Sequence, residues 1–386
     1  MWIFARTTVI ILMRGEIMEN NTLTNKKDTR NYGIDLLKIV SMIMIIVLHI
    51  IGNGSILKNT TAFSPQNNLL WFLKAACFCC VNCYALATGF LMYDKKVKYS
   101  NIIYLYLQVV FYMLFISVIY FIINPKLITI KNLVDIVFPF AHDGYWYFTA
   151  YFGMFFFIPY LNILIKNLNK RQFTQLLVVI TVLFTVLPLA FDFDIFYLKS
   201  GYSVFWLIAM YLFGAYFKKY DLKNYFKKRT GLLIYILSSS AAFAIRMLLA
   251  FVKTKADWIT VKGTFIINYC SPFVLMSSIG LLILFSNMHI KGRSTSIIKF
   301  FAPLTFGVYL IHVNPFLWES GEGLFEHLAS RSIFVILLYI VVVTAAVFLI
   351  CSMIDYIRLL IFKSLKVKQA SDKVVQYISK KVNKHN

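Results

Sequence analysis

The sequence has few charged residues. Asp, Glu, Lys and Arg occupy only 14% of its 386 positions, whereas 60% of the residues are hydrophobic and 17% are aromatic. About a quarter of the residues in a typical soluble domain are charged, so this composition excludes a soluble domain. The apolar runs are long enough to cross roughly 30 Å of hydrocarbon as helices. They predict an all-α integral membrane protein.

Ten apolar runs have the length of a transmembrane helix, although the sixth is short. They fall at residues 34–53, 69–92, 101–124, 145–165, 173–190, 202–217, 231–252, 265–287, 297–317 and 332–362. A bundle of about ten transmembrane helices is therefore predicted.

The basic residues predict the orientation of this bundle. Alternate connecting segments, beginning with the N-terminal one, carry about three times as many Lys and Arg residues as the segments between them. Because basic residues concentrate in cytoplasmic loops, both termini are predicted to be cytoplasmic. The net charge of +23 then reflects topology and attraction to anionic membrane lipid. It does not indicate a nucleic-acid partner.

The ends of the chain lie outside the predicted bundle. We expect residues 1–30 to form a polar tail, residues 31–362 the membrane domain and residues 363–386 a basic cytoplasmic tail. We hypothesise that residues 1–17 are not translated. The codons before Met18 can form a purine-rich stretch of the kind that precedes bacterial start codons.

Cysteine is scarce, and its spacing does not suit a metal site. Four of the six cysteines lie within one predicted helix, where helical spacing offers no tetrahedral S4 geometry. They are Cys77, Cys79, Cys80 and Cys83. We predict no metal and interpret these residues as small side chains that pack one helix against another. A thiol that carries an acyl group is the alternative, but the surrounding sequence supplies no base to activate it.

Three ionisable residues, Asp35, Lys38 and His49, lie in the first apolar run. A charge inside hydrocarbon is costly, so it is kept where it faces a partner, a cavity or a reaction. On a helix, Lys38 and His49 would lie about 20° apart around the axis and roughly 16 Å apart along it. They would share a face, with a cation near one membrane surface and an imidazole deeper in. Asp35 would lie one turn before Lys38 on the same stripe and could contact it.

Polar and aromatic residues in later runs are candidates for substrate binding. Trp146 and Tyr147 open the fourth run. They could form an aromatic belt at the membrane surface or a stacking platform for a sugar. Arg246, near the end of the seventh run, could extend to the membrane surface or bind an anionic group.

The ninth run ends in a polar cluster of Tyr309, His312 and Asn314. An intramembrane histidine can be a hydrogen-bonded packing residue, although function is the stronger default at membrane depth. His49 and His312 are both expected in the outer half of the bundle, which favours a cavity shared by the two.

Four motifs follow one another along the chain. They are Lys38 with ten residues before His49, Ala87-Thr88-Gly89-Phe90-Leu91 before Lys95-Lys96, Tyr145-Trp146-Tyr147-Phe148 through Ile158-Pro159-Tyr160-Leu161-Asn162, and Phe306-Gly307-Val308-Tyr309-Leu310-Ile311-His312. In this order they resemble the motifs of the membrane acyltransferase-3 family, bacterial O-acyltransferases that act on surface polysaccharides. The resemblance spans residues 30 to about 360. Thr88 departs from it, since Ser is usual there, and so does Gly144-Tyr145 where many relatives have His-Leu.

The resemblance implies an O-acyltransferase in the bacterial plasma membrane, with residues 31–362 as its acyltransferase domain. Such an enzyme moves an acyl group, usually acetyl, from cytoplasmic acyl-CoA to a sugar hydroxyl of a surface glycan or of a lipid-linked sugar. Acetyl-CoA would be the donor substrate, and no bound cofactor is expected.

The predicted shared face of the first helix agrees with this reaction. Lys38 could bind phosphates of CoA, and the pantetheine arm could extend toward His49. An imidazole can take the proton of a hydroxyl near neutral pH, so His49 is the predicted general base. Asp35 is included with the catalytic group because it could hold Lys38, although simple ion pairing is equally compatible with its position.

Two other classes of membrane protein remain as alternatives. A secondary transporter would also have around ten helices with intramembrane charges, and an inverted repeat between its halves would favour it. We find no such repeat. A polysaccharide exporter or flippase would need a large hydrophilic cavity, for which the charged residues are too sparse.

Overall fold

The computed structural model describes residues 30–141, 143–255, 263 and 265–384. All regular secondary structure within these residues is helical, which confirms the predicted all-α fold. Apart from Arg30, the predicted N-terminal tail lies outside the described residues.

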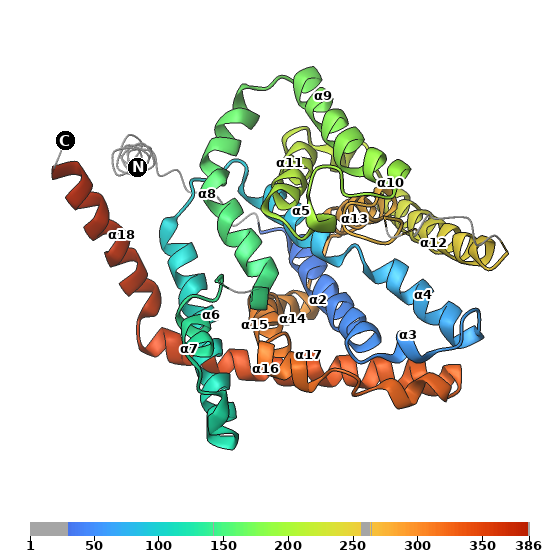
Figure 1. Ribbon diagram of the computed structural model, residues 1–386. Coiled ribbons are helices and arrows are strands. Elements are labelled where there is room, and N and C mark those ends of the chain that lie inside the picture. The colour runs from blue at the N-terminus through green and yellow to red at the C-terminus, as the bar shows by residue number, and fades with distance from the viewer. Residues whose placement is uncertain (1–29, 142, 256–262, 264, 385–386) are drawn as a thin grey trace.

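The helices are arranged around a central helix, α2 (Figure 1). Their bounds are α2 Tyr32–Gly52, α3 Ile56–Asn59, α4 Pro65–Cys77, α5 Cys80–Met92, α6 Tyr99–Ile123, α7 Ile130–Val137, α8 Trp146–Asn167, α9 Lys170–Thr181, α10 Leu187–Phe191, α11 Val204–Lys219, α12 Lys228–Lys253, α13 Pro272–Ser286, α14 Arg293–Phe301, α15 Thr305–His312, α16 Pro315–Ser320, α17 Ile333–Ser364 and α18 Val367–Lys384.

Eight of the predicted runs are long and apolar enough in the structure to cross a membrane. They are α2–α3, α4–α5, α6, α8, α9–α10, α12, α14–α15 and α17. The other two predicted runs contain the shorter helices α11 and α13, of 16 and 15 residues. Every predicted run thus coincides with helix in the part of the chain described, while the total of ten spans and the cytoplasmic termini stay predictions.

The second and the ninth predicted spans are both broken into consecutive helices. The second breaks between Cys77 and Cys80, and all four of its cysteines are buried, as expected of packing residues. The ninth breaks at Asn314 and Pro315. The Asn314 side chain accepts a hydrogen bond from the Phe316 backbone N–H at 3.2 Å and so caps α16.

Glycine lets α5 and α11 approach to backbone contact. A Cβ atom on Gly89 would lie 2.0 Å from the Tyr211 carbonyl oxygen, and one on Gly214 would lie 2.0 Å from the Leu86 carbonyl oxygen. Small residues at helix crossings in membranes allow this close approach. The contact fixes α5, which carries Tyr84 at the site described below.

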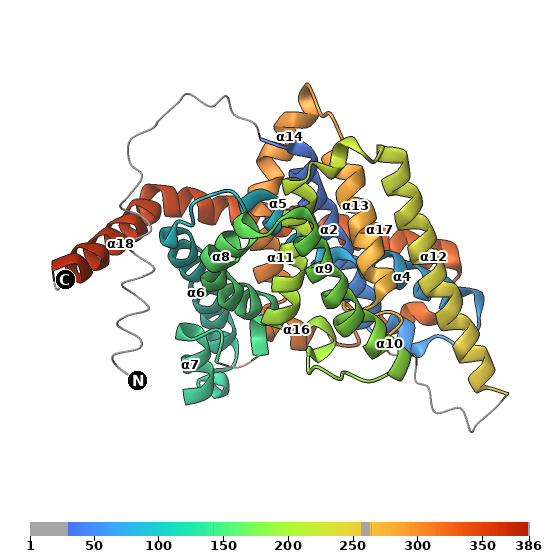
Figure 2. The ribbon, with the colours of Figure 1, turned by 90° about the horizontal axis from the view of Figure 1, so that it is seen from above.

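The two ends of α2 lie at opposite ends of the bundle. Figure 2 shows the start of α2 at the end where α14 lies, whereas α7 and α16 lie at the other end. A Cβ atom on Gly33 would lie 1.9 Å from the Phe285 carbonyl oxygen, so the start of α2 packs directly on the end of α13. Lys38 and His49 are therefore separated along α2, with Lys38 nearer the end of the bundle that carries α14 and His49 nearer α16.

A buried ion pair in α17 holds three helices together. The Arg358 guanidinium donates from Nη2 and Nε to the two carboxylate oxygens of Asp355, at 2.7 and 3.0 Å. Gln108 and Tyr112 of α6 donate to the same carboxylate at 3.1 and 2.7 Å. A Cβ atom on Gly307 of α15 would lie 1.9 Å from the carboxyl carbon of Asp355. This network therefore sets the position of α15.

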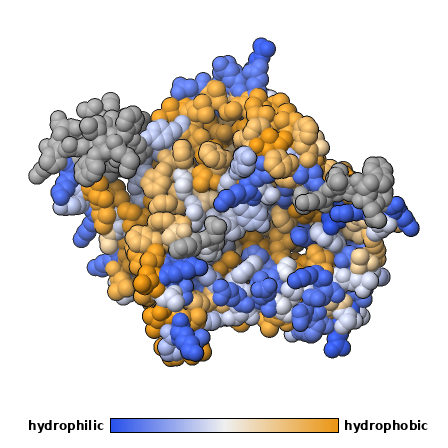
Figure 3. Space-filling model, viewed as in Figure 1, coloured by the Kyte–Doolittle hydropathy of each residue, from blue (hydrophilic) through white to orange (hydrophobic). Residues whose placement is uncertain are grey.

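The outside of the bundle is apolar. Ile122 of α6 and Phe334 of α17 are 76% and 73% exposed, which suits contact with lipid. Figure 3 shows apolar side chains over a large part of one face, with hydrophilic ones mainly at the periphery and in its lower half. The predicted basic tail forms α18, which turns away from α17 (Figure 1) and bonds to α6 through Lys368 Nζ and Ser100 Oγ, 3.0 Å apart.

Candidate functional site

A cavity of about 520 Å³ lies beside the C-terminal half of α2. Its wall includes α2 from Met42 onward and residues of α4, α5, α8, α15 and α16. The size suits a small ligand or part of a larger one. Four of the predicted site residues line it, namely His49, Trp146, Tyr147 and Tyr309.

The structure brings the two intramembrane histidines together. His49 of α2 and His312 at the end of α15 are 263 residues apart in sequence, yet His49 Nδ1 lies 3.1 Å from His312 Nε2. His49 also packs edge-on against Trp318 of α16, with ring centroids 4.7 Å apart. His312 does not line the cavity, so it can affect the cavity only through its contact with His49.

The hydrogen bonds fix the tautomers of this pair. His312 Nδ1 lies 2.6 Å from the Val308 carbonyl oxygen. Because a carbonyl only accepts, this nitrogen carries the proton, and in the neutral ring Nε2 is then an acceptor. His49 must donate from Nδ1 to that acceptor. The lone pair of His49 is consequently on Nε2, which makes this atom the proton acceptor of the pair.

An aromatic wall forms one side of the cavity. The Trp146 ring stacks on Tyr269 with centroids 5.7 Å apart and an interplanar angle of 29°. Tyr202 contacts both rings, at 4.4 Å from Trp146 and 4.9 Å from Tyr269. The Tyr147 ring contacts the rings of Tyr84 and Tyr309, with centroids 6.2 Å apart in each pair, and these three rings continue the wall. Flat aromatic surfaces with polar tips are suited to contacts with a sugar ring.

Tyr309 and Asn314, predicted together as substrate-binding residues, have different surroundings. The Tyr309 side chain lines the cavity, and its buried hydroxyl has no hydrogen-bond partner among the described residues. Asn314 is fully buried behind the cavity wall, where it donates to the Tyr145 hydroxyl at 3.1 Å. Tyr145 in turn donates to the Leu310 carbonyl at 2.7 Å. Asn314 therefore supports the wall that carries Tyr309.

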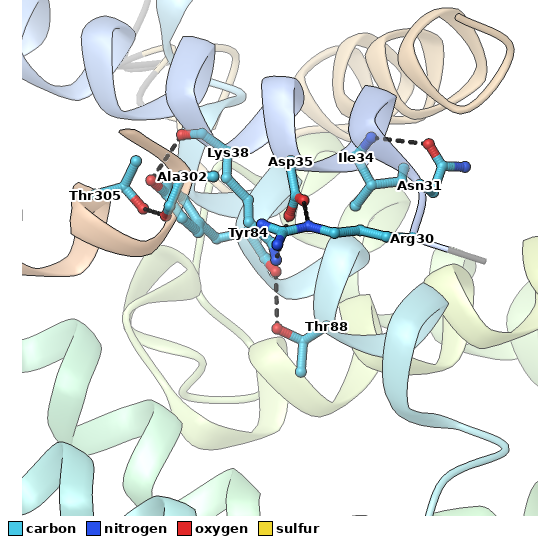
Figure 4. A network of polar contacts seen from close by, with 9 residues as sticks. All are labelled: Arg30, Asn31, Ile34, Asp35, Lys38, Tyr84, Thr88, Ala302 and Thr305. Carbon is cyan, nitrogen blue, oxygen red and sulfur yellow. Dashed lines mark hydrogen bonds and ion pairs between the residues drawn. The ribbon is translucent and has the colours of Figure 1, made fainter. Parts of the chain in front are cut away.

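Lys38, the cation predicted to bind the donor, lies toward the other end of α2. Asp35 contacts Lys38 Nζ at 3.6 Å, so the expected contact between the two is present, and it also contacts Arg30 Nε at 2.6 Å (Figure 4). Neither Asp35 nor Lys38 lines the cavity, which ends at Met42, one turn beyond Lys38. Tyr84 connects the two regions, because it lines the cavity and donates to the Lys38 carbonyl at 2.7 Å (Figure 4).

Arg246 lies outside this cavity. Its guanidinium carbon is 4.4 Å from the centre of the Trp71 ring, and both residues line a second, adjacent pocket between α4 and α12. The Lys74 ammonium, 4.9 Å from the same ring centre, lines the main cavity. Trp71 thus contacts one cation from each of the two spaces.

A comparison with models of protein families found one match. The sequence model of a family described as an acyltransferase domain matches residues 31–354. The chain belongs to the acyltransferase-3 family. It is an acyltransferase, and its long apolar helices make it a multi-pass membrane protein. No curated protein and no solved structure matched the chain.

Residues of two acyltransferase-3 motifs form hydrogen bonds that stabilise the helix bundle. Asn162 donates to the Met92 carbonyl at 3.1 Å and accepts from the Tyr211 hydroxyl at 2.6 Å, which ties α8 to α5 and α11. Thr88 donates to the Tyr84 carbonyl at 2.9 Å (Figure 4). A serine hydroxyl makes the same bond within a helix, so the departure at this position preserves the contact.

Several cavity residues escaped the sequence analysis. The most informative is Lys74, because a cation within an apolar run is the same signal that identified Lys38. Tyr202, Tyr269 and Trp318 carry no such signal, since single aromatic residues are common throughout this chain. Glu319 of α16 also lines the cavity but is exposed.

Proposed function

We propose that this acyltransferase moves an acyl group, acetyl above all, from acyl-CoA to a sugar hydroxyl. The acceptor is a cell-surface polysaccharide or its lipid-linked precursor, and the enzyme acts in the bacterial plasma membrane. One observation carries the proposal. A histidine whose second nitrogen is fixed as a donor lines a cavity with an aromatic wall, and this arrangement is suited to deprotonating a sugar hydroxyl.

His49 acts as the general base on the acceptor. Its Nε2 takes the hydroxyl proton while the hydroxyl oxygen attacks the thioester carbonyl of the donor. The new ester O–C bond forms, the C–S bond breaks, and the proton passes from His49 to the departing CoA thiolate. His312 accepts from His49 Nδ1 throughout and so holds the ring in the required orientation.

The donor extends along α2 from the opposite end. Lys38 and Arg30 form the cationic end, where CoA phosphates would bind. The pantetheine arm would then run roughly 16 Å along the helix axis to reach His49. Asp35 holds both cations in place and lies about 21 Å along α2 from His49. Its proposed role is therefore positioning, and it does not take part in the proton transfer.

The cavity favours transfer over the export alternative. Its volume of about 520 Å³ is in the range of small-ligand sites. It has space for a sugar unit and an acyl group, and the described residues that form its wall are mostly apolar and aromatic. A conduit for a hydrated polysaccharide would need a wider, more polar lining.

The proposal as a whole is tested by surface chemistry in the producing cells. Surface glycan should carry acetyl esters when the gene is present and lose them when it is deleted, as measured by base-labile acetate release. Complementation with the wild-type gene should restore the esters. Unchanged ester content in the deletion strain would contradict the proposed activity.

Lys38→Ala is expected to weaken binding of acyl-CoA, whereas Lys38→Arg should keep much of it, because charge is what a phosphate requires. The fold should survive, since Asp35 keeps its 2.6 Å contact with Arg30. Binding can be measured on purified protein in detergent, with the exposed Lys166→Ala as a control. His49→Ala should leave acyl-CoA affinity largely intact. If His49→Ala lost affinity and Lys38→Ala did not, the proposed direction of the donor would be reversed.

A further inference from the structure

Two cations share one indole ring beside the cavity. Arg246 and Lys74 lie 4.4 and 4.9 Å from the centre of the Trp71 ring. Arg246 comes from α12 and Lys74 from α4, and the two helices also meet through the edge-on rings of Phe72 and Phe243, 5.7 Å apart. The two helices therefore place both charges in a defined arrangement.

Among the described residues, neither cation forms an ion pair with a carboxylate. In the part of the chain that the structure describes, the ion pairs involve other basic residues, and Glu319, which lines the same cavity as Lys74, forms none with it. Both Lys74 and Arg246 are half-buried. Like charges in a medium of low dielectric repel each other, so this arrangement becomes favourable when an anion binds next to both.

We infer that Lys74, Trp71 and Arg246 form a binding site for the phosphate of the acceptor, and that this acceptor is a sugar attached to a lipid diphosphate. The inference rests on the proposed function, in which the sugar occupies the main cavity. Lys74 faces that cavity and Arg246 the adjacent pocket. A phosphate between them would leave the sugar on the His49 side.

The charge and the surroundings favour a lipid diphosphate. Two cations match a group that carries two or more negative charges, and a guanidinium presents a fork of donors to phosphate oxygens. The adjacent pocket includes the apolar residues Phe63 and Leu249. On the outside of α12, Leu248 and Phe251 are 59% and 51% exposed. A prenyl chain that left the pocket along α12 would therefore enter lipid directly.

The inference is tested by binding to purified protein in nanodiscs, with farnesyl diphosphate, farnesol and inorganic pyrophosphate as probes. Farnesyl diphosphate should bind, farnesol should not, and pyrophosphate should bind more weakly. Arg246→Gln and Lys74→Gln should each weaken farnesyl diphosphate binding about tenfold or more, because each removes a charge-assisted contact. Lys58→Gln changes an exposed cation of α3 and should have no effect.

Acyl-CoA binding on the same samples separates the outcomes. If wild-type protein binds acyl-CoA but farnesyl diphosphate affinity is absent, or is unaffected by both substitutions, the acceptor site is overturned while the proposed function stands. If pyrophosphate binds as well as farnesyl diphosphate, the lipid source is overturned in favour of a soluble sugar phosphate. If acyl-CoA itself does not bind, the proposed function fails. Intact acyl-CoA binding in the two variants also establishes that they are folded.

Discussion

Replacing His49 with Ala is expected to reduce acyl transfer by about 10²- to 10⁴-fold, because loss of a general base typically costs that much. The protein should still reach the membrane at a normal level. His49 lies at a cavity wall, and the fixed contact of His312 with the Val308 carbonyl does not depend on it. Transfer from labelled acetyl-CoA to glycan, normalised to the amount of protein, measures the effect.

Two further variants make this result specific. His289 is an exposed histidine, so His289→Ala should transfer at the normal rate. His312→Phe removes the acceptor for His49 Nδ1 and should give a partial loss, because His49 keeps its basic nitrogen but loses its orientation. Normal glycan acylation by His49→Ala would refute the proposed base. A larger loss in His312→Phe than in His49→Ala would transfer the role to His312.

The sequence predicted the parts of the site that depend on one helix. Lys38 and His49 lie on the same helix, so their separation follows from helix geometry alone. The contact between Asp35 and Lys38 is equally local and is present at 3.6 Å. The positions of the helices could also be predicted from the apolar runs, because each run must reach across the bilayer. A helix lies at every one of these runs.

Contacts between distant helices could not be predicted in the same way. The periodicity of the sequence does not show which face of α12 meets α4. Arg246 was therefore predicted to extend to the membrane surface or to bind an anionic group, and its contact with Trp71 was not predicted. Asn314 was predicted as a substrate residue because of its polarity, but its cap on α16 and its hydrogen bond to Tyr145 could not be predicted. The pairing of His49 with His312 was favoured by their similar depth, but the 3.1 Å contact and the tautomers required coordinates.

The ion pair of α17 could have been predicted from the sequence alone. Asp355 and Arg358 are three residues apart within an apolar run, which is the spacing of opposite charges that meet on a helix. In the structure they are 0% and 3% exposed. Charge at these positions therefore does not mark the end of the helix, since α17 continues to Ser364.

Arg358→Met is expected to lower the free energy of unfolding by about 3–5 kcal/mol, because it leaves the buried Asp355 carboxylate without its cation. Gln108 and Tyr112 would still donate to that carboxylate, but neither carries a compensating charge. The loss should also reach the site, since Asp355 packs directly against Gly307 of α15, the helix that carries His312. Unfolding in detergent and acyl transfer should therefore both be affected.

The matched variants identify the uncompensated charge as the cause. The double variant Asp355→Asn with Arg358→Met removes both charges and should recover most of the lost stability, because a neutral amide costs far less to bury than a lone carboxylate. Arg331→Met changes an exposed arginine just before the same helix and should leave unfolding unchanged. If the double variant were no more stable than Arg358→Met, lost packing of the long arginine side chain would explain the effect, and the ion pair would not be what holds α15 against α17.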